Sequence, residues 1–143
     1  MAAPAGGERD LRVLLATMSP ELRPGRFVFA TTAEVPSGCT PVVVVREDEG
    51  VTVVLPQDDA DRLGLGYEYV AAMITLRVHS ALDAVGLTAA VAHQLAAAGM
   101  SCNVVAGYHH DHLFVPVERA DEAVDLLRAL AAETGGSRAD GYA

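Results

Sequence analysis

The second half of the chain carries a succession of strand and helix patterns that few folds share. In residues 70–78 apolar side chains recur at every second position, which is the period of a strand with one face on a core. From Leu87 to Ala98 apolar residues recur at spacings of four, four and three, so they line one face of a helix. Asp83 is placed to cap this helix and Gly99 to end it.

Two further strands and a second helix complete the pattern. Residues 101–106 predict a short strand, residues 107–111 a hairpin loop, and the residues up to Pro116 the next strand. A last helix is predicted over residues 119–132, ending at Gly135 and Gly136. The order β-α-β-β-α is that of a ferredoxin-like unit without its closing strand. That strand has to come from the first half, from residues 137–143 or from another subunit.

The first half contains a looser version of the same pattern. It predicts a helix over residues 10–18, strands over 27–31, 41–45 and 51–55, and a helix over 58–63. We therefore expect an α+β fold of two ferredoxin-like βαββαβ-type units packed together, with helices on one face of antiparallel sheets. The expected boundaries are a flexible tail at 1–9, a first unit at 10–66, a second unit at 67–133 and a tail at 134–143. The open edge of the second unit favours a homodimer.

Charge and composition exclude several classes of function. The 143 residues include 10 basic residues, all of them scattered arginines, against 19 acidic residues, which argues against a nucleic-acid partner. No secretory signal and no apolar run of about 20 residues is present, so we expect a cytoplasmic protein with no membrane partner. Nucleophile-elbow, P-loop and dinucleotide motifs are absent as well. Cys39 and Cys102 lie far apart and are expected to be small buried side chains.

The connection between the first strand and first helix of the second half is the best candidate for a binding site. The start of a helix presents unpaired backbone N–H groups that favour a carboxylate. Gly86 is costly in a helical first turn unless a ligand or a neighbouring backbone approaches closely there. Ser80 or Asp83 could accept a hydrogen bond from an ammonium group. The alternative is structural, with Asp83 as an ordinary cap and Gly86 as a packing contact.

The run "ITLRVHSALDAVGLTAAVAHQLAAAGMSCNVVAGYHHDHLFVP", residues 74–116, resembles small bacterial proteins with tandem ACT domains. It is also similar to the ACT units of the eukaryotic cytosolic arginine sensors. The resemblance extends more weakly through "SPELRPGRFVF" at residues 19–29 and "EDEGVTVVL" at residues 47–55, and so covers most of residues 11–130.

The resemblance implies a regulatory ligand-binding module rather than an enzyme, and no cofactor. In that family amino-acid effectors usually lie at the interface between units, against the loop that joins the first strand to the first helix. Carried onto this chain, it implies an amino acid or related carboxylate as the small-molecule partner, bound near the loop from Ser80 to Leu87. The implied ligand-binding residues are Ser80, Asp83, Val85, Gly86, Leu87 and Asn103.

A histidine cluster in the hairpin loop offers a second hypothesis. His109, His110, Asp111 and His112 place four metal-ligand types in one turn, which could serve a metal-binding protein or a metal-dependent hydrolase. Only His110 and His112 lie on one side of an extended segment, so a complete site would need His79, His93 or a second subunit. A solvated loop without metal is the alternative. A third hypothesis is a structural interaction module whose pocket is filled by its own side chains.

Overall fold

Two compact units make up the protein, and they interleave along the chain. The computed structural model describes residues 7–140. The larger unit contains the chain up to Arg23 and again from Met73 onward, and the smaller unit contains Pro24–Ala72. The ends of the two expected tails, residues 1–6 and 141–143, lie outside the described residues.

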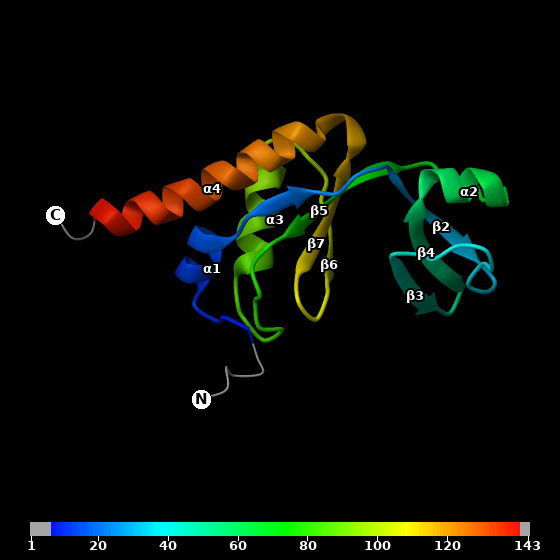
Figure 1. Cartoon of the computed structure of the whole chain (residues 1–143), viewed down its shortest axis with the longest axis horizontal. Coiled ribbons are helices and arrows are strands. Elements are labelled where there is room, and N and C mark those ends of the chain that lie inside the picture. The colour runs from blue at the N-terminus through cyan, green and yellow to red at the C-terminus, as the bar shows by residue number, and fades with distance from the viewer. Residues whose placement is uncertain (1–6, 141–143) are drawn as a thin grey trace. The chain divides into compact units, whose positions relative to one another are not determined.

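The larger unit combines a four-stranded sheet with three helices (Figure 1). Across its sheet the strands follow the order β1, β5, β7, β6, and β6 and β7 form an antiparallel hairpin. The elements are α1 (Leu11–Thr17), β1 (Pro20–Leu22), α3 (Leu87–Ala97), β6 (Asn103–Ala106), β7 (Asp111–Pro116), a 3₁₀ turn (Val117–Arg119) and α4 (Ala120–Asp140). The strand β5 (Val70–Leu76) belongs to this unit from Met73 onward.

β1 is the closing strand that the second half of the sequence lacks. It runs antiparallel to β5, with Glu21 opposite Thr75. Just outside this pairing, the N–H of Arg77 donates to the carbonyl of Ser19 at 2.7 Å. Of the three sources that the sequence left open, the first half supplies the strand. The expectation of self-association rested on an open edge of β5, and β1 occupies that edge. The homodimer therefore stays a prediction, but the open edge no longer supports it.

Apolar faces of the helices explain the packing of the larger unit. α1, α3 and α4 pack against one another. Leu87, Val91 and Leu95 are the buried residues of α3, as the helical spacing of the sequence predicts. The largest fully buried side chains of the unit are Leu14, Ile74, Leu76, Val91, Leu95, Leu113, Phe114 and Leu127.

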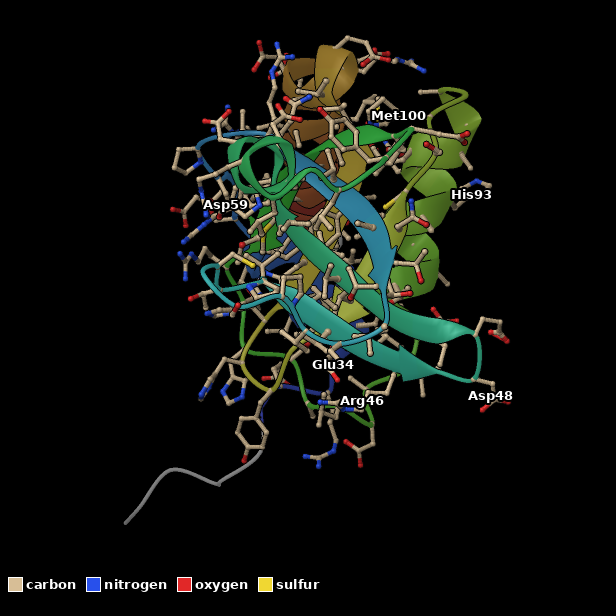
Figure 2. The ribbon with its side chains drawn as sticks, turned by 90° about the vertical axis from the view of Figure 1, so that its right-hand side faces the viewer. Glu34, Arg46, Asp48, Asp59, His93 and Met100 are labelled. Carbon is tan, nitrogen blue, oxygen red and sulfur yellow. The ribbon has the colours of Figure 1, made fainter. Side chains whose placement is uncertain are left out.

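The smaller unit contains β2 (Phe27–Thr32), β3 (Val43–Glu47), β4 (Gly50–Pro56), α2 (Gln57–Leu63) and the first residues of β5. β4 pairs antiparallel with β2 and β3, and β2 pairs with the start of β5. In Figure 2, Arg46 and Asp48 mark the hairpin that joins β3 and β4. Its core holds Val28, Ala30, Val51, Val53, Leu55 and Ala60.

The α+β class and the ferredoxin-like arrangement are confirmed, whereas two local expectations about helix ends are wrong. α3 begins at Leu87 with Gly86 at its N-cap, so Asp83 lies too far upstream to cap it. α4 continues past Gly135 and Gly136 to Asp140, because glycine weakens a helix by about 1 kcal/mol without forbidding it. The sequence also gave no sign of β1, which has only three residues.

No helix within residues 7–140 combines the length and the apolar character that crossing a membrane would require.

Candidate functional site

The loop between β5 and α3 is anchored by the N-terminal segment of the chain. The N–H of Glu8 donates to the carbonyl of His79 at 2.8 Å, and the N–H of Ala81 donates to the carbonyl of Glu8 at 2.9 Å. Glu8 and Ser80 thereby form an isolated parallel bridge. These backbone contacts fix the first part of the loop well before the helix starts.

α3 begins without a side-chain cap. Gly86 occupies the N-cap position with φ of +104°, and no side chain accepts a hydrogen bond from the first N–H groups of the helix. A Cβ atom at this position would also lie 2.9 Å from Cδ2 of Leu11. The positive φ by itself explains why position 86 is a glycine, since residues with a side chain disfavour positive φ. The free N–H groups of the first turn make this helix end attractive to an anion.

A pocket of about 120 Å³ opens at this helix end, and we call it the α3 pocket. Asp111, at the start of β7, is the charged residue among those that line it, and its side chain is buried. The hydroxyl of Ser80 donates to Oδ2 of Asp111 at 3.5 Å. The pocket is lined by Ser80, Ala81, Leu82, Ala84, Gly86, Leu87, Thr88, Ala106 and Asp111.

The surroundings of Asp111 disfavour its charged form. Burial raises the pKa of its carboxyl above the ordinary value, while the hydrogen bond from Ser80 and the nearby His112 and His110 act to lower it. Burial is the largest of these effects. A cationic group placed in the α3 pocket would stabilise the carboxylate that has lost part of its hydration.

A second pocket, of about 230 Å³, shares Ser80, Ala81 and Leu82 with the α3 pocket, and we call it the Arg9 pocket. Arg9 Nε and Asp83 Oδ1 form an ion pair at 2.9 Å, with both side chains exposed. Such surface pairs contribute about 1 kcal/mol or less. The remaining lining residues are Gly7, His79 and Tyr108.

The predicted ligand-binding residues separate into three groups. Ser80, Gly86 and Leu87 line the α3 pocket, and Asp83 lines the Arg9 pocket instead. Val85 is 83% exposed and lines neither pocket. Asn103 also lines neither, at the exposed start of β6. The ligand-binding role of all six stays a prediction.

Asp111 is the pocket residue that sequence reasoning missed. It was placed in a hairpin loop as a metal-ligand type, whereas the sheet brings the start of β7 beside the loop that precedes α3. No spacing along the chain connects residues so far apart. The available signal was an acidic residue at the first position of an apolar strand, where a buried carboxylate needs a partner.

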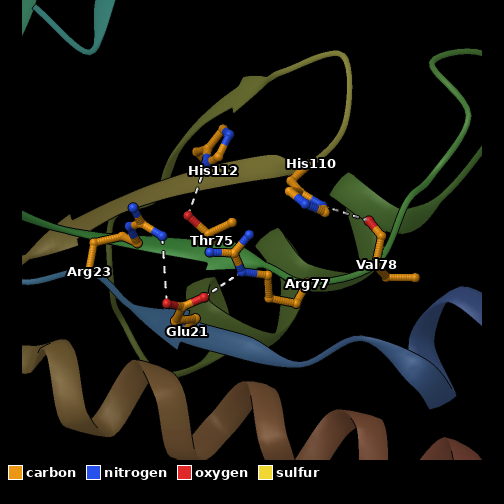
Figure 3. A network of polar contacts seen from close by, with 7 residues as sticks. All are labelled: Glu21, Arg23, Thr75, Arg77, Val78, His110 and His112. Carbon is orange, nitrogen blue, oxygen red and sulfur yellow. Dashed lines mark hydrogen bonds and ion pairs between the residues drawn. The ribbon is translucent and has the colours of Figure 1, made fainter.

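The histidines of the hairpin do not converge on one point. His110 Nδ1 lies 3.4 Å from the carbonyl oxygen of Val78, and His112 Nδ1 is hydrogen-bonded to Thr75 Oγ1 at 3.0 Å (Figure 3). His93 lies on the exposed side of α3 (Figure 2). Within residues 7–140 no group of three or more His, Cys, Asp or Glu side chains could hold a metal ion. The metal hypothesis therefore has no support in the described part of the chain.

A carboxylate lies between two guanidinium groups on the same sheet (Figure 3). Glu21 forms an ion pair with Nε of Arg77, and its Oε1 lies 3.6 Å from a terminal nitrogen of Arg23. The hydrogen bond from Arg77 lowers the pKa of the Glu21 carboxyl. Since all three side chains are exposed to solvent, this cluster contributes charge to the surface rather than much stability.

Stability is expected to decrease when the pH falls through the ordinary titration range of histidine. Burial, and secondarily the charge of His110, lower the pKa of His112; Arg23 and Arg77 act in the same direction and Asp111 opposes them. The unfolded chain therefore binds this proton more readily than the folded chain. The contribution of His112 is complete above its unfolded pKa, near 6.5, and is lost as the pH falls toward its lower folded pKa.

Substitution His112→Asn retains a nitrogen or oxygen near Thr75 and removes the titration. Melting temperatures measured between pH 7.5 and 5 are expected to fall less steeply in this variant than in the wild type. The matched control is His93→Asn, on the exposed side of α3, which is expected to keep the wild-type slope. An unchanged slope in His112→Asn would contradict the assignment.

Comparisons with known proteins place this geometry in a family. Two models of the ACT domain match adjacent parts of the chain, residues 6–72 and residues 68–129. Among the curated proteins, none matches the chain.

Solved structures share the fold over most of their length. A protein of unknown function from Vibrio cholerae, described as a possible transport protein, is 46% identical, with a TM-score of 0.77 over 85% of this chain and 95% of that one. A protein from Agrobacterium tumefaciens is 20% identical, with a TM-score of 0.66 over 80% and 89%. The regulatory subunit of aspartate kinase from Thermus flavus is 11% identical, with a TM-score of 0.60 over 80% and 98%. With two ACT-domain matches in tandem on a ferredoxin-like α+β fold, the chain belongs to the ACT-domain family.

Proposed function

We propose that this protein is a non-catalytic regulatory module that binds an amino acid, or a related small zwitterion, in the α3 pocket. The observation that carries the proposal is the uncapped start of α3, which opens on a pocket that also contains the buried carboxylate of Asp111. An amino acid has complementary charges for both. Its carboxylate would accept hydrogen bonds from the first backbone N–H groups of α3. Its ammonium group would pair with Asp111.

The volume of the α3 pocket limits what it can hold. About 120 Å³ corresponds to roughly four water molecules at their share of liquid volume. This is enough for the charged head group of an amino acid and a short side chain. We infer that a ligand with a longer side chain would extend out of the pocket, past the exposed Leu82 that lines it.

Family membership supports a regulatory role. The ACT-domain matches cover nearly all of the described chain, and the aspartate kinase neighbour with the same fold is described as a regulatory subunit. The expected output is a change in the pairing of units or in the binding of a partner protein, driven by different ligand affinities of the two states. A cytoplasmic location and a homodimer are part of this proposal.

Substitution Asp111→Asn is expected to weaken amino-acid binding about tenfold or more, because it removes the charge that faces the ammonium group. The measurement is isothermal titration calorimetry with a panel of the common amino acids. A ligand should first be identified by thermal shift, since a concentration one hundred times its dissociation constant stabilises the fold by about 2.7 kcal/mol.

Asp83→Asn is the matched control, because it changes an exposed carboxylate in the adjacent Arg9 pocket. Affinity that is lost in Asp111→Asn and kept in Asp83→Asn would support the α3 pocket. The reverse pattern would move the ligand to the Arg9 pocket. If no amino acid binds the wild type, the proposal fails and an interaction module without ligand becomes the better account.

A further inference from the structure

A larger groove lies elsewhere in the larger unit, between β1 and α4. Its volume is about 780 Å³, within the range of about 300–1,000 Å³ that is usual for small-molecule sites. One wall is the segment Ser19–Leu22, and the other is α4 through Asp121, Asp125 and Arg128, with Arg77 also in the lining. We call it the β1–α4 groove, and it shares no residue with the α3 pocket.

The backbone of β1 has one unused edge along this groove. In the described part of the chain β1 pairs with β5 alone. The carbonyl of Ser19 and the N–H of Arg23 bond to β5, and backbone direction alternates along a strand. The backbone N–H and carbonyl of Glu21 therefore also point toward β5, whereas the backbone groups of Pro20 and Leu22 point outward. The outer edge presents the N–H and carbonyl of the exposed Leu22 and the carbonyl of Pro20, a residue that is otherwise buried and has no N–H.

The charges of the groove are separated along its length. β1 and α4 run in opposite directions, so the start of α4 lies toward Leu22 (Figure 1). Asp121 is near that end, and Arg128 lies seven residues further, about 10 Å along the helix axis. Arg77, bonded to Ser19 through its backbone, is at the Arg128 end.

The charged side chains of α4 are available for a ligand. Glu21 and Arg77 pair with each other across the strands. Between residues 7 and 140, by contrast, no ion pair is recorded for Asp121, Asp125 or Arg128. A ligand with a cation at one end and an anion about 10 Å away would therefore be complementary to the groove.

We propose that the β1–α4 groove binds a short peptide with free termini, about three residues long, extended and antiparallel to β1. Three extended residues span about 10 Å, which matches both the charge separation and the three residues of β1. The peptide ammonium lies toward Asp121 and its carboxylate toward Arg128. Its first residue pairs with Leu22, and the N–H of its third residue donates to the carbonyl of Pro20.

The test is a titration of the isotope-labelled full chain with trialanine, followed by NMR. The expected result is a saturable shift of the Leu22 amide signal and little change at Glu21, whose N–H faces β5. Trialanine acetylated at its N-terminus, or amidated at its C-terminus, is expected to bind about two- to fivefold more weakly. If the acetylated and the amidated peptide both bind as tightly as trialanine, the charge assignment is overturned. If no peptide gives a saturable shift, the site itself is overturned.

Methylated peptides test the strand pairing itself. Trialanine with an N-methyl group on its third residue loses the donor to Pro20 and is expected to bind several-fold more weakly. The matched control carries the methyl group on its second residue, whose N–H points away from β1, and is expected to bind like trialanine. Equal affinity of the two methylated peptides would overturn antiparallel addition to β1.

Two protein variants give the same test from the other side. Asp121→Asn is expected to abolish the difference between free and acetylated peptide, and Arg128→Gln the difference between free and amidated peptide. Glu133→Gln, an exposed residue further along α4, is the control and should keep both differences. Amino-acid binding at the α3 pocket should be unchanged in all three, so that the two proposals fail or stand separately.

Discussion

A fragment of residues 67–143, the second unit together with the C-terminal tail as delimited from sequence, is expected not to fold on its own. It lacks β1, which closes the sheet beside β5, and α1, which packs against α4 and α3. The missing segment also carries Leu14, Leu15 and Met18, which are nearly fully buried. Burial of three such side chains contributes about 5–9 kcal/mol, which is comparable to the whole stability of a domain.

The measurement is circular dichroism with thermal melting, together with amide signal dispersion in NMR. Addition of a synthetic peptide of residues 7–26 is expected to restore a cooperative transition, because it supplies α1 and β1. The same peptide with Leu14→Asp, which places a charge at a fully buried position, is the matched control and should fail to restore it. A cooperative melt of the fragment alone would show that β1 and α1 are dispensable.

Substitution Phe114→Ala is expected to reduce the free energy of unfolding of the full chain by about 3–5 kcal/mol. Phe114 lies in β7 with none of its surface exposed, and its truncation removes a large apolar side chain and leaves a cavity. For a chain of this size the melting temperature should fall on the order of 10 °C. Urea unfolding followed by circular dichroism gives the free energy.

Tyr108→Ala is the matched control for this prediction. It removes an aromatic side chain from the loop that joins β6 and β7, where Tyr108 is 64% exposed. Its effect is expected to stay within about 0.5 kcal/mol, as is usual for exposed positions. Similar losses in the two variants would mean that the packing of β7 is not as described.

The elements of the fold were predictable where a repeat of polarity marks them. The alternation before residue 77, and the spacing of Leu87, Val91 and Leu95, predicted β5 and α3 within a few residues. β1 escaped prediction because three residues are too few to establish a period. Its place in the sheet depends on an edge of β5, which no local pattern reports.

The candidate site was predictable only in part, for a similar reason. Ser80, Gly86 and Leu87 are neighbours in sequence, so a rule about helix starts could bring them together. Asp83 was misassigned as the cap, because the true N-cap is a glycine with positive φ, a conformation that sequence does not display. Asp111 joins the pocket across the sheet, and its importance depends on burial.

The sequence by itself determined the ferredoxin-like class through its apolar periodicity, and the family through the resemblance of residues 74–116, because both are properties of neighbouring residues. The tertiary structure decided which strand closes the larger unit, which carboxylate faces the uncapped start of α3, and which charges line the β1–α4 groove. Each of these joins residues far apart in the chain. Their contact depends on the burial of a shared core, and the free energy of that burial is not written in any single segment.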